Sequence, residues 1–308
     1  MARMIDVIGV PYHLGGTQNG TRGGPEGLVQ NGFLAALEGR GHNVTYANLR
    51  AVSGRDDIFC GAHHEGHRVR YADELIALIP LLARQTGLAL VEGSTPLVLG
   101  GDHSIVMGSI GAALHPDALH DDRLGLVWID AHYDAHTEWT THTGNTHGMP
   151  LAALLGEGRQ FRPAIGKQKF LPSQVIHIGA GVADCEPEEI ALLSRLGVPC
   201  FPETFLAEKG WSPVYAALQA LASRVERIWV SFDLDSVCVE DAPGVSYRRL
   251  KGGLTRQEVL MLANWLSHTG KVVGADIVEM NFQYERLDAH GSSVTAHLAS
   301  EFACQLLK

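Results

Sequence analysis

The middle of the chain reads Leu124-Gly-Leu-Val-Trp-Ile-Asp-Ala-His-Tyr-Asp-Ala-His136, an apolar block that runs directly into aspartate and histidine. A short, continuous apolar block is typical of a strand that is covered on both faces of a sheet. We therefore expect a buried strand at 124–129. Its carboxyl end should carry the acidic and imidazole side chains that follow.

The same alternation of short apolar runs and longer amphipathic stretches continues along the whole chain. The apolar runs predict strands at 4–10, 43–49, 95–99, 124–129, 174–178, 227–232 and 271–277. The amphipathic stretches predict helices at 25–40, 69–85, 187–196, 255–268 and 292–307. Repeated strand–helix units are typical of a doubly wound parallel sheet. Since neither a Pro/Gly/Ser-rich linker nor an internal repeat divides the sequence, we expect a single domain over residues 1–308.

Three of the predicted strands run into polar motifs. The motifs are Gly100-Gly-Asp-His-Ser104, Asp130-Ala-His-Tyr-Asp-Ala-His136 and Asp233-Leu-Asp235. Because ligands of parallel sheets gather at the carboxyl ends of the strands, we expect these motifs to meet. Side-chain alternation along a strand also predicts that the first Asp of each Asp-x-His or Asp-x-Asp pair shares a face with its partner.

Six side chains in these motifs are candidate metal ligands: His103, Asp130, His132, Asp134, Asp233 and Asp235. Clustered carboxylates repel one another unless positive charge compensates them. Two divalent cations cancel the formal charge of the four aspartates, and a mainly oxygen ligand set with two imidazoles favours Mn²⁺ over Zn²⁺. Each motif alone would indicate no more than a turn or a helix cap. Together, at three strand ends, they predict a site for two metals.

In order and spacing, these motifs resemble the signature of the ureohydrolase (arginase/agmatinase) family, and the resemblance extends over nearly the whole chain. It implies a three-layer α/β/α fold around a central, mostly parallel eight-stranded sheet, and two Mn²⁺ per subunit. The ligands implied by the resemblance are His103 and Asp134 for one metal, His132 and Asp235 for the other, and Asp130 and Asp233 as bridges between them.

A further segment is most similar to arginases within that family. Thr143-Gly-Asn-Thr-His-Gly148 resembles the arginase loop that binds the substrate's α-carboxylate, so the resemblance makes Thr143 and Asn145 substrate-binding residues and His147 a proton shuttle. It also makes Glu279 the acceptor of the guanidinium and Asp134 the group that passes a proton to the departing amine. The implied reaction converts L-arginine and water into L-ornithine and urea.

Other positions depart from the arginase pattern. The loop at 236–249 is bulkier and more basic than the family's, with Tyr247-Arg248-Arg249 near its end. Glu186 is the nearest match to the acidic residue that meets the α-amino group, and His136 replaces an amide near the α-carboxylate. These differences leave open other guanidino or formimino acids (guanidinobutyrate, guanidinopropionate, formiminoglutamate) and agmatine.

Two other functional classes stay open on the residues alone. A single-metal deacylase on a similar scaffold also uses Asp-x-His and a later Asp, but a second bound metal would exclude it. A non-catalytic, metal-dependent binding protein is the other alternative. The presence of all six ligand candidates together with Glu279 and His147 argues against it.

The composition of the chain indicates which binding partners and which cellular compartment to expect. With 24 Lys+Arg against 34 Asp+Glu, the formal net charge is −10, which favours neither nucleic acid nor an anionic membrane as partner. The five Cys form no CxxC pair, and the first residues show no apolar signal-peptide core, so we expect a cytoplasmic protein. The resemblance implies a homo-oligomer, either a trimer or a hexamer. We expect His63, His64 and His67 to lie in a solvated loop.

Overall fold

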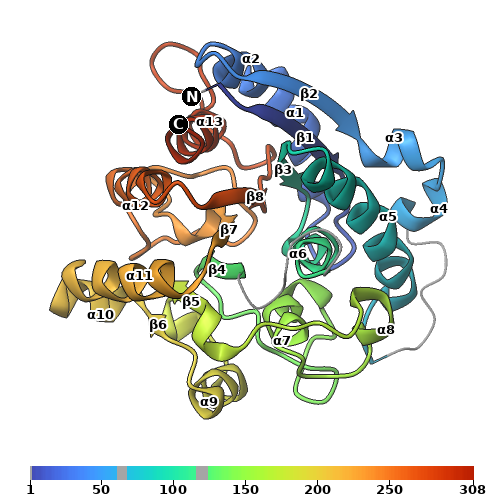
Figure 1. Ribbon diagram of the computed structural model, residues 1–308, viewed down its shortest axis with the longest axis vertical. Helices are drawn as coiled ribbons and strands as arrows, with labels where there is room; N and C mark the ends of the chain where they lie inside the picture. The colour runs from blue at the N-terminus through green and yellow to red at the C-terminus, as the bar shows by residue number, and fades with distance from the viewer. Residues whose placement is uncertain (1, 61–67, 116–123) are drawn as a thin grey trace.

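The computed structural model describes residues 2–60, 68–115 and 124–308, and it is built around a sheet of eight parallel strands (Figure 1). The strands lie in the order β2-β1-β3-β8-β7-β4-β5-β6. Their bounds are β1 (Met4–Val10), β2 (Asn43–Asn48), β3 (Thr95–Gly100), β4 (Leu124–Ile129), β5 (Val175–Ile178), β6 (Cys200–Phe201), β7 (Arg227–Asp233) and β8 (Val272–Val278). The seven predicted strands are confirmed to within one residue at each end. Only the two-residue strand β6 escaped sequence prediction.

Helices cover both faces of this sheet. Within the described ranges they are α1 (Gly24–Gln30), α2 (Phe33–Glu38), α3 (Leu49–Ser53), α4 (Asp56–Cys60), α5 (Ala72–Val91), α6 (Val106–Ala113), α7 (Pro150–Leu154), α8 (Arg162–Ile165), α9 (Pro187–Leu196), α10 (Glu203–Lys209), α11 (Ser212–Arg224), α12 (Arg256–His268) and α13 (Val294–Leu306). The strands are buried on both sides: Leu97 and Leu99 of β3 pack into the core beneath α1, α2 and α10–α13, whereas Val98 packs into the core beneath α5, α6, α7 and α9. The predicted three-layer α/β/α fold is therefore confirmed (Figure 1).

Two helix predictions are wrong in their bounds. The helix predicted at 25–40 is interrupted between α1 and α2, because Gly32 adopts a left-handed conformation with φ of 87°. The helix predicted to end before Gly87 continues through it to Val91, since burial of Leu82 and Ala89 on either side outweighs the weak helix propensity of one glycine. By length and composition α5 is the one described helix that could span a membrane, yet it packs in the core.

The four central strands, in the order β3-β8-β7-β4, bring the polar motifs to one edge of the sheet. His103 follows β3, Asp130 follows β4, Asp233 ends β7 and Glu279 follows β8. Because all four strands are parallel, their carboxyl ends lie side by side. The topology thereby gathers residues that are up to 176 positions apart in the sequence.

Candidate metal centre and active site

The three polar motifs share one local turn. In each of them an aspartate Oδ1 accepts the backbone N–H of the residue two positions later, which bends the chain as it leaves the strand. The pairs and their O···N distances are Asp102 and Ser104 (3.0 Å), Asp130 and His132 (2.7 Å), and Asp233 and Asp235 (2.8 Å). Side-chain alternation along the strand was expected to align Asp130 with His132 and Asp233 with Asp235. This reason is wrong, because β4 ends before Asp130 and β7 ends at Asp233.

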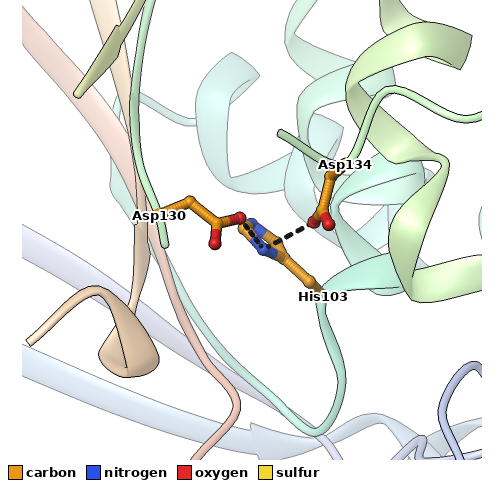
Figure 2. A group of neighbouring side chains, drawn as sticks. All are labelled: His103, Asp130 and Asp134. Atoms are coloured by element: carbon orange, nitrogen blue, oxygen red, sulfur yellow. Dashed lines mark ion pairs between the residues drawn. The ribbon is translucent and has the colours of Figure 1, made fainter. Parts of the chain in front are cut away.

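The first group of candidate ligands surrounds His103. Its Nδ1 lies 3.0 Å from Asp130 Oδ2, 3.1 Å from Asp134 Oδ2 and 3.0 Å from an oxygen of Asp233 (Figure 2 shows the first two contacts). This nitrogen is buried and has no hydrogen-bond partner in the part of the chain that the structure describes. When the other ring nitrogen donates to Ser231 Oγ, at 2.9 Å, Nδ1 presents a lone pair to the space between the carboxylates. That arrangement fits a bound cation.

The second group surrounds His132 and shares Asp130 with the first. His132 Nδ1 lies 3.5 Å from Asp130 Oδ1 and 3.3 Å from Asp235 Oδ2. The two oxygens of Asp130 thus face different histidines. Asp235 Oδ1 is buried and has no hydrogen-bond partner within residues 2–60, 68–115 and 124–308. The structure therefore brings all six predicted ligands together in two adjacent groups of metal-ligating atoms.

The charges of these carboxylates conflict unless cations are present. Burial, reinforced by the negative charge of Asp130, raises the pKa of Asp134 to about 7. Burial and Asp235 likewise raise the pKa of Asp233 well above its ordinary value. Burial also opposes ionisation of Asp130, but the imidazoles of His103 and His132 outweigh it and lower the pKa. Divalent cations would let all these carboxylates ionise, so the donor set fits hard or borderline metals.

The sequence did not indicate two supporting residues, Trp128 and Ser231. Trp128 Nε1 donates to Asp130 Oδ2 at 2.9 Å, and its ring stacks on His103 with 4.3 Å between centroids. Ser231 holds the far nitrogen of the same histidine. Each lies two residues before a strand-end aspartate, on the same face of its strand. Strand periodicity was therefore a usable signal for both.

We predict that Trp128→Phe lowers metal affinity by about 10- to 100-fold, because it keeps a smaller aromatic ring but removes the N–H that orients Asp130. Titration of metal-free protein with Mn²⁺ in a calorimeter measures the change. The matched control is Trp229→Phe, since Trp229 is also a buried strand residue and donates from Nε1 to Asp276, at 2.6 Å, outside both ligand groups. Equal loss of affinity in both variants would contradict the orienting role.

Glu279 and His147 lie beside the metal groups. Glu279 is 3% exposed and has a positive φ of 67°, and its N–H donates to Gly101 O at 2.8 Å. Its Oε1 accepts the N–H of His103 at 2.9 Å and lies 3.4 Å from His147 Nδ1. Burial opposes a charge on His147, but the carboxylate of Glu279 outweighs it and raises the pKa to about 9. Asp134 also has a positive φ, 49°, and such strained backbone is concentrated at functional sites.

A cleft of about 850 Å³ opens over the metal groups. Its walls include the four residues predicted to bind the amino acid group (Thr143, Asn145, His136 and Glu186), the predicted proton shuttle His147, and the three loop residues Tyr247, Arg248 and Arg249. Glu279, the predicted guanidinium acceptor, is buried and is not among the described residues that line the cleft. Asn145 Oδ1 accepts from Arg70 Nη1 at 3.2 Å, a contact between positions 75 residues apart that the sequence did not indicate. The predicted loop histidines His63, His64 and His67 lie outside the described residues.

The basic loop residues are held by other protein groups. Tyr247 packs its ring against His132 and His147, with centroids 5.7 and 5.4 Å apart. Arg248 lies over the ring of Tyr284, at 4.6 Å, and Arg249 is buried and donates to Glu203 at 2.8 Å. Tyr247 thus adds an aromatic ring to the cleft wall beside His132 and His147, while Arg248 and Arg249 each contact another side chain.

Comparison with known proteins identifies the family. The arginase family model matches residues 3–308. The chain belongs to the arginase family. It is 32% identical to an arginase of Brevibacillus brevis over 313 residues, with all of both chains covered. The native arginase of Bacillus caldovelox superposes with a TM-score of 0.87 at 30% identity, covering 99% and 98% of the two chains. The formimidoylglutamase of Bacillus subtilis, at 20% identity and a TM-score of 0.73, shares the fold alone.

Membership of the arginase family confirms the predicted class of reaction. The protein is a ureohydrolase, a hydrolase that acts on the amidine C–N bond of a guanidino group. The family is metal-dependent, and the two His/Asp groups of this arginase-family chain are able to bind metal.

Proposed function

We propose that this protein is a binuclear manganese arginase, which hydrolyses L-arginine to L-ornithine and urea. The observation that carries the proposal is that the loop at 143–148 and both metal groups face one cleft. One end of that cleft can activate water, and the other presents donors for a carboxylate. An α-amino acid with a terminal guanidinium matches both ends.

The metal end would carry two Mn²⁺, bound by His103 and Asp134, by His132 and Asp235, and by the bridging Asp130 and Asp233. When bound, two divalent cations supply a nucleophile from water at neutral pH. Glu279 would pair with the guanidinium through charge-assisted hydrogen bonds and fix its plane. Both side-chain contacts of Glu279 described above use Oε1, and Oε2 would pair with the substrate. Asp134 would hand a proton to the departing amine, and His147 would exchange protons with solvent.

The far end of the cleft would bind the amino acid group. Thr143 and Asn145 would donate to the α-carboxylate, and Glu186, which His136 contacts at 3.1 Å, would receive the α-amino group. Because Arg70 occupies Asn145 Oδ1, the amide presents its NH₂ donors to the cleft rather than its acceptor. This orientation suits a carboxylate and supports an amino acid substrate over agmatine.

The test is release of urea by the manganese-loaded protein from arginine, agmatine, guanidinobutyrate and guanidinopropionate, with formamide release scored for formiminoglutamate. We expect the highest kcat/KM with arginine. The alternative is another guanidino or formimino acid, and Arg249 favours it, because its Nη1 is buried without a hydrogen-bond partner in the described part of the chain. Turnover of such an acid without turnover of arginine would overturn the substrate assignment but not the metal site.

Arg70→Met is predicted to raise KM for arginine about tenfold, because Asn145 would lose the contact that fixes its amide, a hydrogen bond to a charged group worth about 1.5 kcal/mol. Any slow turnover of agmatine, which has no carboxylate, should be unaffected. The matched control is Arg68→Met, since Arg68 donates to the backbone of Trp139 instead. An equal effect on both substrates would refute a role in carboxylate recognition.

We further propose a cytoplasmic location and a trimeric or hexameric assembly. Cys185, Cys200, Cys238 and Cys304 are free thiols, which is typical of a reducing compartment. The assembly follows from the family resemblance, and light scattering coupled to size-exclusion chromatography measures it.

A further inference from the structure

A second set of metal-ligating side chains lies at the rim of the cleft, away from the two metal groups. This rim cluster consists of His136, His142, Glu186 and Glu188. The Nε2 atoms of His136 and His142 lie 3.1 and 3.2 Å from the same oxygen, Glu186 Oε2. His142 Nε2 also lies 3.3 Å from Glu188 Oε1. His142, Glu186 and Glu188 each place a ligand atom within 4.8 Å of the other two, and His136 joins them through its contact with Glu186.

The rim cluster combines exposed side chains with buried carboxylate oxygens: the side chains of His142, Glu186 and Glu188 are 60%, 39% and 41% exposed. Among the described residues, Glu186 Oε2 is buried and has no hydrogen-bond partner despite two nearby imidazoles, and Glu188 Oε2 is buried and unpartnered as well. His136 is only 9% exposed, its Nδ1 lies 3.2 Å from Thr140 Oγ1, and its Nε2 faces Glu186. A buried oxygen left without a hydrogen bond costs free energy unless something else satisfies it.

The backbone around the rim cluster is tied down. The N–H of Glu186 donates to Glu189 at 3.0 Å, where α9 begins, and Glu189 also accepts the N–H of Ala135, which precedes His136, at 3.1 Å. The loop that carries His142 is closed by a hydrogen bond from Gly144 N to Thr141 Oγ1 at 2.9 Å. The donors are thus presented by segments with fixed geometry, as a metal site requires.

We propose that the rim cluster is a third divalent cation site, selective for a zinc-type ion. Two imidazole nitrogens and two carboxylate oxygens form a donor set of the kind that Zn²⁺ takes in tetrahedral sites. The formal charge of the two carboxylates equals that of the cation. A cation there would give the buried Glu186 Oε2 a partner.

A cation at the rim cluster excludes the substrate's amino group from Glu186. This consequence rests on the proposed function, in which Glu186 binds the substrate's amino group. Binding of the cation itself is independent of the proposed function. Zinc should therefore inhibit competitively: at a zinc concentration about ten times its dissociation constant, KM for arginine rises about tenfold with kcat unchanged.

The test is a zinc titration of the manganese-loaded protein, with zinc and manganese in the desalted protein counted by mass spectrometry. His142→Gln and Glu188→Gln are the test variants, because neither residue belongs to the proposed catalytic or substrate-binding set. The matched control is His297→Gln, since His297 and Glu301 form an ordinary exposed pair at 3.3 Å on α13.

We expect the wild type and the control to retain one more zinc ion than either test variant, at equal manganese content. Equal zinc content in all four proteins would overturn the third site. If the extra zinc depends on His142 and Glu188 but KM for arginine does not change, the third site stands and the pairing of Glu186 with the substrate's amino group fails.

Discussion

Asp130→Asn should reduce kcat/KM for arginine by at least about a thousandfold, equivalent to about 4 kcal/mol of transition-state stabilisation. Asp130 is fully buried, and its two oxygens face His103 and His132 separately, so it is the carboxylate that both ligand groups share. An amide has the same shape but only one acceptor oxygen and no charge. It cannot neutralise either cation, and metal content should fall together with activity.

Asp276→Asn is the matched control for this variant. Asp276 is also a buried aspartate on a central strand, but it is hydrogen-bonded by Ser109 and Trp229, each at 2.6 Å, and belongs to neither ligand group. Because burial raises its pKa to about 7, an uncharged amide is a mild replacement near neutral pH. We expect Asp276→Asn to keep its full metal content and near-normal activity. Asp130→Asn with two bound metals and undiminished turnover would refute the bridging role.

Glu279→Gln should reduce kcat/KM by about a hundred- to a thousandfold while metal content stays unchanged. Truncating a buried charge pair costs about 2–5 kcal/mol, and in this variant the guanidinium would lose its only carboxylate partner in the proposed scheme. The amide oxygen can still accept the N–H of His103, so the turn that positions the metal ligand should survive.

The measurements are steady-state kinetics and metal analysis on the same preparation. A further readout is His147, whose pKa is raised by Glu279: without that carboxylate, any rate profile that depends on His147 should move to lower pH. Loss of metal in Glu279→Gln would show that Glu279 supports the metal centre rather than the substrate.

Much of the candidate site was predictable because its information is local. The motifs around His103, Asp130 and Asp233 are contiguous, and each follows an apolar strand whose bounds the sequence defines to within one residue. The parallel strand–helix pattern places all strand ends at one edge, and the strand order β3-β8-β7-β4, which only the structure shows, makes the motifs neighbours there. The sequence did not predict helix bounds correctly at two glycines. Gly32 interrupts a predicted helix, whereas α5 continues through Gly87 because its flanking residues are buried in the core.

By itself, the sequence determined the layer architecture, the edge of the sheet that carries the chemistry, and the residue types gathered there. Hydrophobic periodicity depends on residues that are adjacent in the sequence. The alternation of strands with helices follows from it and predicts a parallel sheet, so both can be inferred without coordinates. Tertiary structure alone decided which distant side chains touch: Arg70 with Asn145, and His136 and His142 with Glu186. Those contacts depend on how loops close over the sheet to within an ångström, and no local pattern encodes a distance between segments that meet only after folding.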